Sequence, residues 1–419
     1  MRRTEAAGLR RRAGRGEQDV SLWMPNPHIS NVFSNLFKIL SYGHGIFFVA
    51  LQTALMIGFF FEWLRDRKAA ILNGNMKPQA DTARVSVIIP IHNEEERMES
   101  LLRSLLVQSF PAQIIFVDDR STDKSPAMLA RFADEARKRG IDCVIITLSE
   151  NPGPNHKQFA LSRGITEAGG DYFLFTDGDC EVPPDWIRAM AGRMRDEKTG
   201  AVIGPVFKKK PQRGFFFLYQ CYDHLVRYNY LAGAIGLGAA GGGFGNNMII
   251  SKKALEKAGG YDAIPPSPTE DAALISQIRK ISGYRVRAAA HIDAAVETRA
   301  EKSWVSFINQ TLRWNNGGLF SPEALTRFNY NLLMLVISTG ILAIPFLPFF
   351  PGLWPMPAGV FIVMIENTIA IFALFRAKMP RAGILAKFGY FLALLFTPVY
   401  FTLMTLMGYA KIKTTWKND

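Results

Sequence analysis

The sequence predicts an α/β domain, built on a doubly wound and mostly parallel sheet, that is joined to transmembrane helices. Short apolar runs alternate with segments of helical period over residues 84–204, which is the pattern of repeated β-α-β units. Two of these runs end in paired aspartates, and ligands bind at the carboxyl edge of such sheets. Four long, nearly uncharged stretches lie outside this region, and each is long enough to span a bilayer.

The composition is that of a membrane-associated protein rather than of a nucleic-acid binder. The chain has 419 residues and a net charge of +13, yet only 20% of its residues are charged and 48% are hydrophobic. Part of the basic excess is an arginine-rich N-terminal tail, and the other bases could face anionic lipid or phosphate. Three cysteines, Cys143, Cys180 and Cys221, have no metal-ligand spacing and suit a reducing compartment.

The first apolar stretch predicts a transmembrane helix. We expect residues 1–34 to form a basic, weakly ordered tail and residues 35–68 to form the helix. Trp63 and the charged run that follows it are typical of anchors at membrane interfaces. A signal peptide is less consistent with the sequence, because the apolar run starts far from the N-terminus and no small-residue cleavage site follows it.

The α/β domain is expected over residues 84–300. Its strands are runs rich in Val, Ile or Phe, at residues 85–90, 114–117, 144–147 and the run that ends at Asp177. Asn93 and Glu96 have the spacing of a capping box for the helix after the first strand. Later helices are expected to begin near Ser125 and His156.

The second half of the domain contains three ambiguous stretches. The aromatic run at residues 215–222 could lie on a membrane surface or in a core. Residues 233–245 contain seven glycines and match the dinucleotide fingerprint, but no strand precedes the match, so we expect a close-approach loop that leads into Asn246 and Asn247. The lysines at residues 208–210 are expected in a solvated loop.

The C-terminal part predicts an interfacial helix region, residues 301–328, and transmembrane helices over residues 329–410. Apolar stretches at residues 331–350, 352–375 and 384–409 are each long enough for one span. With the α/β domain inside the cell, four spans would place both termini outside, whereas the bases near both termini favour the inside. One stretch that does not cross the bilayer would reconcile the two.

Five clusters of polar residues fall at strand ends or in loops, where a nucleotide-sugar site requires them. Sugar transfer needs a grip on the base or ribose, a cation that offsets the diphosphate charge, a carboxylate that takes the acceptor's proton, and basic donors for the leaving group. Each cluster alone could be a turn, a solvated helix start or an ordinary amphipathic helix. The clusters are Asp118–Asp119, Lys157, Asp177 with Asp179, Glu270–Asp271, and Gln310 with Arg313 and Trp314.

The order and spacing of six motifs give the chain a resemblance to the inverting glycosyltransferases of family 2. More narrowly, the chain resembles their membrane-embedded branch, which includes cellulose, chitin and hyaluronan synthases and ceramide glucosyltransferase. The most discriminating motif is Gln310-x-x-Arg313-Trp314 (QxxRW), because soluble members usually lack it. The other motifs are residues 89–94 (IPIHNE), 117–123 (VDDRSTD), 176–179 (TDGD), 245–248 with 259–262 (GNNM and GGYD), and 269–271 (TED).

The resemblance covers a little over half the chain and implies a GT-A type nucleotide-diphospho-sugar transferase fold. It implies that Asp177 and Asp179 hold the diphosphate together with Mg²⁺ or Mn²⁺. Asp271 would be the base that deprotonates the acceptor, with Glu270 beside it. The residues implied in binding uracil or ribose are Pro90, His92, Asn93, Glu94, Asp118 and Asp119.

The resemblance also implies roles for basic and aromatic residues. Lys157 would lie near the nucleotide, although the residue before it is His156 where the family has Gly. Arg313 would contact the diphosphate and Trp314 the acceptor sugar, from an interfacial helix that also carries Gln310. Arg120 is a further departure, because the family commonly has Gly at this turn position.

We therefore expect an integral membrane glycosyltransferase of the cell (inner) membrane, with its catalytic domain in the cytoplasm. It would move a hexose or N-acetylhexosamine from a UDP-sugar to a lipid or glycan acceptor by a metal-assisted single displacement with inversion. A processive polysaccharide synthase of the same family is one alternative, although three C-terminal spans make a small channel at best. A transporter or scaffold that binds nucleotide without chemistry is the alternative from another class.

Overall fold

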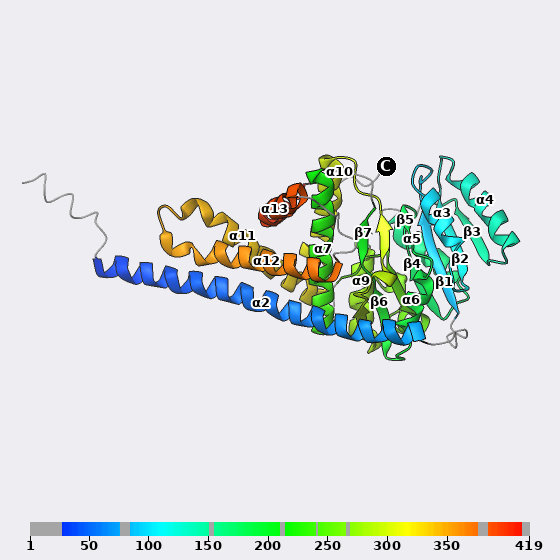
Figure 1. Ribbon diagram of the computed structural model, residues 1–419, viewed down its shortest axis with the longest axis horizontal. Helices are drawn as coiled ribbons and strands as arrows, with labels where there is room; N and C mark the ends of the chain where they lie inside the picture. Colours follow the sequence, from blue (N-terminus) through cyan, green and yellow to red (C-terminus); the bar gives the residue numbers. More distant parts are fainter. Residues whose placement is uncertain are drawn as a thin grey trace, which may run out of the picture.

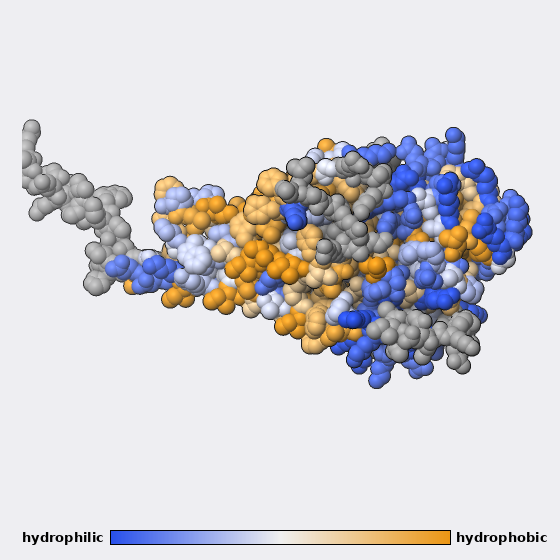
Figure 2. Space-filling view, viewed as in Figure 1, coloured by the Kyte–Doolittle hydropathy of each residue, from blue (hydrophilic) through white to orange (hydrophobic). Residues whose placement is uncertain are grey.

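The molecule has two parts of opposite surface character. The computed structural model describes residues 27–75, 84–150, 155–209, 214–239, 242–264, 269–375 and 384–412. Figure 1 shows an α/β domain at one end and a helical arm at the other. In Figure 2 the surface of the arm is mainly apolar, whereas that of the α/β domain is mainly polar. The two parts therefore suit different surroundings, a bilayer and water.

A seven-stranded sheet forms the centre of the α/β domain, in the order β3-β2-β1-β4-β8-β6-β9. Strands β1 to β4 are parallel, as the repeated β-α-β pattern predicts. The sheet is mixed, because β8 runs antiparallel to both β4 and β6. The strands are β1 (Val85–Ile91), β2 (Gln113–Asp119), β3 (Cys143–Leu148), β4 (Tyr172–Phe175), β6 (Thr199–Ile203), β8 (Met248–Ser251) and β9 (Arg285–Ala288). A second, three-stranded sheet contains β5 (Cys180–Glu181), β10 (Val296–Thr298) and β7 (Val206–Lys208).

Helices cover both faces of the main sheet, because successive strand residues point to opposite sides. In β1, Val87 and Ile89 belong to one buried cluster, shared with α3, α4 and α6, and Ile88 belongs to the other, shared with α5, α8 and α9. The helices are α3 (Glu99–Leu105), α4 (Ser125–Lys138), α5 (His156–Thr166), α6 (Trp186–Gly192), α8 (Lys252–Lys257) and α9 (Glu270–Gln277). Short 3₁₀ or π turns lie at Tyr261–Ala263, Ile278–Ser282, Ile292–Ala294, Ile344–Phe346 and Pro351–Leu353.

The loop after β1 differs from the expected capping box. Helix α3 begins at Glu99 and is capped by neither Asn93 nor Glu96. Asn93 has a φ of 53°, a left-handed conformation that asparagine adopts more readily than most residues. Its side chain accepts a hydrogen bond of 2.8 Å from the N–H of Thr122. Asn93 therefore joins the loops that follow β1 and β2, instead of starting a helix.

Four helices of the arm are long and apolar enough to cross a membrane. They are α2 (Pro27–Asn75), α11 (Ala324–Leu342), α12 (Pro355–Phe375) and α13 (Ile384–Tyr409). Residues 27–34 belong to α2, so the expectation of a weakly ordered tail is wrong for them. The tail arginines before residue 27 lie outside the described residues.

Aromatic residues mark two levels along the arm that match the thickness of a bilayer. At the far end, Tyr42 of α2 packs edge-on against Trp354, with ring centroids 5.8 Å apart. Near the α/β domain, Trp63 of α2 stacks on Phe60. The helical rise between Tyr42 and Trp63 is about 32 Å, close to the ~30 Å hydrocarbon core of a membrane. Aromatic rings of this kind gather at both membrane interfaces.

Two further helices, α7 (Phe215–Gly236) and α10 (Trp304–Leu319), lie where the arm meets the α/β domain. Figure 1 shows both running across the direction of α2. At the crossing of α7 with α2, a Cβ on Gly236 would overlap the carbonyl oxygen of Gly58, and one on Gly233 would overlap the backbone at Leu55. Gly233 and Gly236 are thus helical residues that permit close helix packing, and the predicted glycine loop begins only after α7.

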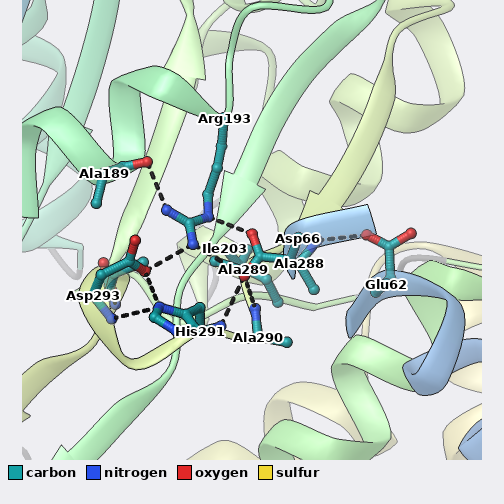
Figure 3. A network of polar contacts seen from close by, with 12 residues as sticks. Glu62, Asp66, Ala189, Arg193, Ile203, Ala288, Ala289, Ala290, His291 and Asp293 are labelled. Carbon is teal, nitrogen blue, oxygen red and sulfur yellow. Dashed lines mark hydrogen bonds and ion pairs between the residues drawn. The ribbon is translucent and has the colours of Figure 1, made fainter. Parts of the chain in front are cut away.

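A buried ionic network, which we name the α2 anchor, fixes the end of α2 to the α/β domain (Figure 3). Asp66 of α2 forms a bidentate ion pair with Arg193 and accepts hydrogen bonds of 2.9 and 2.8 Å from the N–H groups of Ala290 and His291. Glu62, one turn earlier, accepts from the N–H of Ala288 at 3.1 Å. The anchor consists of Glu62, Asp66, Arg193, Arg287 and Asp293.

Candidate active site

One cavity of about 250 Å³ collects most of the residues that the sequence predicts for catalysis. It opens at the carboxyl edge of β4 and extends beneath α10 and beside α7. The predicted residues that line it are Lys157, Asp177, Asp179, Glu270, Asp271, Gln310, Arg313 and Trp314. Carboxylates that lie far apart in the sequence are therefore brought to a single hollow.

Lys157 is the cationic centre of the acidic side of this cavity. It lies in the first turn of α5, and its Nζ is 2.8 Å from Asp177 Oδ1 and 3.6 Å from Glu270 Oε1. Although burial opposes its charge, Asp177 and Glu270 raise the pKa of Lys157 above the ordinary value of a lysine. The ammonium group thus stays charged beside the aspartates that follow β4.

Glu270 and Asp271 are held in the first turn of α9. Asp271 accepts hydrogen bonds from the N–H groups of Gly245, at 2.6 Å, and of Ala272, at 2.7 Å. Burial raises the pKa of both carboxyl groups, and Lys157 offsets part of that rise. A Cβ on residue 245 would press on the Asp271 side chain, so glycine permits the close approach that the sequence predicts for this loop. Asp271 is therefore fixed in direction and more basic than an exposed aspartate.

The three residues of the Gln-x-x-Arg-Trp segment lie on α10, which a capping box at Ser303 starts. Gln310 donates to Glu301 at 3.0 Å, and its own Oε1 is buried without a partner among the described residues. The charge of Arg313 reaches Glu270 and Asp271 and lowers the pKa of both. Trp314 packs near Arg227, whose guanidinium lies 5.7 Å from the ring centroid.

The residues predicted to bind uracil or ribose lie at the adjacent ends of β1 and β2, outside the lining of the cavity. His92 Nδ1 is 2.6 Å from the carbonyl oxygen of Asp119, and the side chain of Asp118 accepts from the N–H of Ser121. The backbone of Glu94 donates to Ser125 Oγ at 2.9 Å. The members of this corner are Pro90, His92, Asn93, Glu94, Asp118 and Asp119.

Arg120 connects this corner to the cavity. Its guanidinium pairs with Asp119 at 2.8 Å and lies 2.6 Å from Nδ1 of His156, the residue before Lys157. Its φ of 55° is a left-handed conformation, which explains why glycine is common at this position in the family that the sequence resembles. The side chains of the two departures from the family pattern, Arg120 and His156, thus contact each other.

Asp177 and Asp179 fit a divalent cation that is also held by a ligand. Among the described residues no group of three His, Cys, Asp or Glu side chains could hold a metal alone. Mg²⁺ commonly uses one or two carboxylates and takes its other ligands from phosphates and water. Both aspartates line the cavity, and Asp177 Oδ1 is buried without a well-directed hydrogen bond, although Lys157 is near. The donor set therefore suits a cation bound together with a diphosphate.

Sequence reasoning missed three basic residues of the cavity, Lys208, His224 and Arg227. Lys208 belongs to β7 and is buried, so its predicted place in a solvated loop is wrong; Lys210 lies outside the described residues. Burial lowers the pKa of Lys208, against the charge of Asp179. His224 and Arg227 lie on α7, where Arg227 pairs with Asp223 at 2.9 Å. The Asp–Arg spacing of four residues within an aromatic helix was the signal that could have found them.

Comparisons with known proteins find similarity to glycosyltransferases. Residues 86–259 match the model of Glycosyl transferase family 2. The chain is 27% identical to a probable glycosyltransferase, YdaM, of Bacillus subtilis (strain 168), over 66% of this chain and 67% of that protein. It is 32% identical to an undecaprenyl-phosphate 4-deoxy-4-formamido-L-arabinose transferase of Enterobacter sp. (strain 638), over 32% of this chain and 39% of the relative.

Two other similarities have lower sequence identity. The beta-monoglucosyldiacylglycerol synthase of Nostoc sp. (strain PCC 7120 / SAG 25.82 / UTEX 2576) is 23% identical over 63% of this chain and 57% of its own length. The solved mannosyltransferase PcManGT from Pyrobaculum calidifontis, in complex with GDP-Man and Mn²⁺, has 20% identity and a TM-score of 0.49, and the superposition covers 90% of this chain and 100% of that one. The match thus spans less than two thirds of the Enterobacter and Nostoc relatives.

Proposed function

We propose, from the match of residues 86–259 to Glycosyl transferase family 2, that the chain is an inverting glycosyltransferase. It would move a sugar from a UDP-sugar to a lipid acceptor. The observation that carries the proposal is the meeting of Asp271, Lys157 and Arg313 in one cavity with the aspartates that follow β4. A fixed carboxylate and two cations in one hollow supply a base for the acceptor and a site for a departing diphosphate.

The donor would lie along the carboxyl edge of the parallel strands. In this proposal the corner formed by Pro90, His92, Asn93, Glu94, Asp118 and Asp119 binds uracil and ribose. Buried carboxylates at strand ends are suited to ribose hydroxyls and to base N–H groups, which donate hydrogen bonds. The diphosphate then reaches the cavity past Lys157, which follows the Arg120–His156 contact.

Asp177 and Asp179 would hold Mg²⁺ or Mn²⁺ beside the diphosphate. When bound, the cation would offset the charge that builds up on the leaving nucleoside diphosphate. Lys157 and Arg313 line the same hollow and would donate to the same phosphate oxygens. Gln310 would help to orient Arg313 and Trp314 from one face of α10.

Asp271 would remove the proton from the acceptor hydroxyl as that oxygen attacks the anomeric carbon. The bond from the anomeric carbon to the diphosphate oxygen breaks in the same step, so the configuration inverts. The hydrogen bond from Gly245 fixes Asp271, and burial raises its pKa, which makes it a better proton acceptor. Glu270 pairs with Lys157 and would keep the ammonium group of Lys157 in place near Asp271.

The acceptor side of the cavity supports a lipid as the substrate class. Besides the catalytic residues, the cavity is lined by α2, α11, α12 and α13, which are long and apolar enough to span a membrane. The names of two relatives specify lipids, undecaprenyl phosphate in one and, as the product of a synthase, monoglucosyldiacylglycerol in the other. We also propose membership of the QxxRW-bearing membrane branch, with the catalytic domain on the cytoplasmic side of the cell membrane, because nucleotide sugars are made in the cytosol.

A donor and acceptor screen tests this function. Purified full-length chain in lipid nanodiscs, with Mg²⁺ or Mn²⁺, would be offered UDP-hexoses and UDP-N-acetylhexosamines and assayed for UDP release. We expect release with one UDP-sugar that rises when a lipid acceptor is added and is lost in Asp271→Asn. Chromatography of radiolabelled product separates a single-sugar lipid from a polymer, which would instead indicate a processive synthase. Undiminished turnover by Asp271→Asn would refute the assigned mechanism.

A further inference from the structure

The cavity is also lined by residues of the helical arm, and apart from Gln52 and Asn367 most of these are apolar. They come from all four helices that are long enough to span a membrane, including α13 through Phe401. The apolar ones include Phe48 of α2, Leu333, Met334 and Ile337 of α11, and Val363 and Met364 of α12. A hollow lined by both carboxylates and aliphatic side chains matches an amphiphile in polarity.

His224 lines the same cavity and has unmet hydrogen-bonding capacity. It is 3% exposed, and neither of its ring nitrogens has a hydrogen-bond partner among the described residues. Its ring stacks on Phe244, with centroids 4.7 Å apart and planes inclined by 13°, and Trp314 lies 5.6 Å away. All three residues line the cavity. Buried polar groups without partners are uncommon and are expected where a ligand supplies the missing contact.

His224 is also close to the catalytic base through the chain itself. Phe244, which stacks on His224, is followed by Gly245, whose N–H binds Asp271 at 2.6 Å. A group bound to His224 would therefore lie next to the carboxylate that takes the acceptor's proton. This position distinguishes His224 from Lys208, because the charge that most stabilises the Lys208 ammonium group is that of Asp179, on the donor side.

The charge state of His224 favours one class of acceptor over another. Burial, with Lys208 and Arg227 nearby, lowers the pKa of His224 well below its ordinary value, so the ring is neutral. A neutral imidazole has one N–H donor and one acceptor nitrogen. A hydroxyl can donate to the acceptor nitrogen, whereas an ionised phosphate only accepts and would leave it unpaired.

We propose that His224, held between Phe244 and Trp314, binds the head group of an uncharged lipid alcohol whose chains lie along α2, α11 and α12. The inference rests on the proposed function and narrows its acceptor to a neutral, hydroxyl-bearing lipid. One head-group hydroxyl donates to the acceptor nitrogen of the imidazole, and the oxygen of a neighbouring hydroxyl accepts from its N–H. That neighbouring hydroxyl keeps its proton for Asp271 and is the attacking group, whereas a phosphate acceptor, already ionised, would not need the base.

The test compares two acceptors and three variants in nanodiscs, with the UDP-sugar that the wild-type chain uses. Monodecanoylglycerol, which has two hydroxyls, represents the lipid alcohol and farnesyl phosphate represents the lipid phosphate. We expect monodecanoylglycerol to be glycosylated and farnesyl phosphate not to be. In His224→Phe, which keeps an aromatic ring, the KM for monodecanoylglycerol should rise roughly 10- to 100-fold, as expected for two lost hydrogen bonds, while the KM for the donor stays unchanged.

Two further variants separate binding from packing. His224→Gln keeps a donor and an acceptor and should restore part of the acceptor affinity. Tyr222→Phe is the matched control, because Tyr222 is a buried aromatic on the same helix whose hydroxyl already has a partner, Thr368, at 2.7 Å. It should leave both KM values unchanged. His224→Phe is compared only if it folds, as judged by UDP binding. If it does not fold, the acceptor KM of His224→Gln is compared with that of Tyr222→Phe. An acceptor KM in His224→Gln equal to that of Tyr222→Phe would then overturn the proposal.

The outcomes also distinguish this inference from the function on which it rests. Wild-type activity with farnesyl phosphate alone would overturn the lipid-alcohol site and leave the glycosyltransferase function intact. An acceptor KM that is unaffected in His224→Phe would do the same. Failure of the proposed function has a different signature, which is the absence of UDP release by the wild-type chain with every donor and acceptor.

Discussion

The α2 anchor and the catalytic cavity are two buried assemblies of charge that differ in how completely their polar atoms are paired. In the anchor, both oxygens of Asp66 and of Glu62 accept hydrogen bonds. In the cavity, Gln310 Oε1 and both nitrogens of His224 are buried without hydrogen-bond partners among the described residues, and Asp177 Oδ1 has only the ammonium group of Lys157 beside it. Similar chemical groups thus form a closed network in one place and an open one in the other.

The difference follows from what each assembly has to hold. An unpaired buried polar group costs roughly 1–3 kcal/mol, so a network that only joins two parts of a protein is best fully paired. Although burial opposes its charge, Asp66 raises the pKa of Arg193 and keeps the guanidinium charged within the anchor. Partial pairing in the cavity leaves hydrogen-bonding groups for a substrate. Substitutions in the fully paired anchor should therefore lower stability, whereas substitutions in the partly paired cavity should lower turnover.

The largest effect is expected at the open assembly. Asp271→Asn removes the proton acceptor while keeping the side-chain shape, and we expect turnover to fall by roughly 10²–10⁴-fold. UDP binding, measured by calorimetry, should persist. Asp134→Asn, on the exposed face of α4, is the control and should turn over like the wild type. Equal losses in both variants would mean that Asp271 has no special role.

The second effect is expected at the closed assembly and concerns stability. Asp66→Asn leaves the buried Arg193 partly uncompensated, and such changes typically cost about 3–5 kcal/mol. For an α/β domain of this size that corresponds to a fall in Tm of roughly 6–20 °C, measurable by thermal unfolding in nanodiscs. Turnover per folded molecule at low temperature should change little. An Asp66→Asn variant that has the Tm of the wild type but no activity would show that the anchor also serves catalysis.

A third effect is a change in pH dependence, which affects only the open assembly. Because burial raises the pKa of Asp271, the acid limb of kcat/KM should lie above the pH expected for an ordinary aspartate, about 3.9. Below the raised pKa the base is protonated, so the rate should fall about tenfold per pH unit. Lys157 lowers that pKa, so Lys157→Met should move the acid limb to higher pH. A shift to lower pH would contradict the electrostatic assignment.

The sequence predicts the parts of the molecule that depend on local pattern. The four parallel strands, and the carboxylates at the end of β2 and just after β4, follow from apolar runs that end in aspartate. The α2 anchor could not be predicted, because Asp66 and Arg193 are 127 positions apart and neither belongs to a motif. Lys208 was misplaced for a related reason. A run of lysines suggests a solvated loop, and only the packing of α7 beside β7 buries the first of them.

The smallest effect tests the role of burial directly, because it involves the same two residue types, Asp and Arg, as the Asp66–Arg193 pair of the anchor. Asp134 pairs with Arg137 at 3.1 Å on α4, but these side chains are 66% and 78% exposed, against 4% and 3% for Asp66 and Arg193. Water screens an exposed pair, so Asp134→Asn should change the free energy of unfolding by no more than about 0.5 kcal/mol. The corresponding change in Tm is about 2 °C or less. If Asp66→Asn were equally harmless, pairing in the anchor would not be what holds α2 to the α/β domain, and the glycine crossing with α7 would be the remaining candidate.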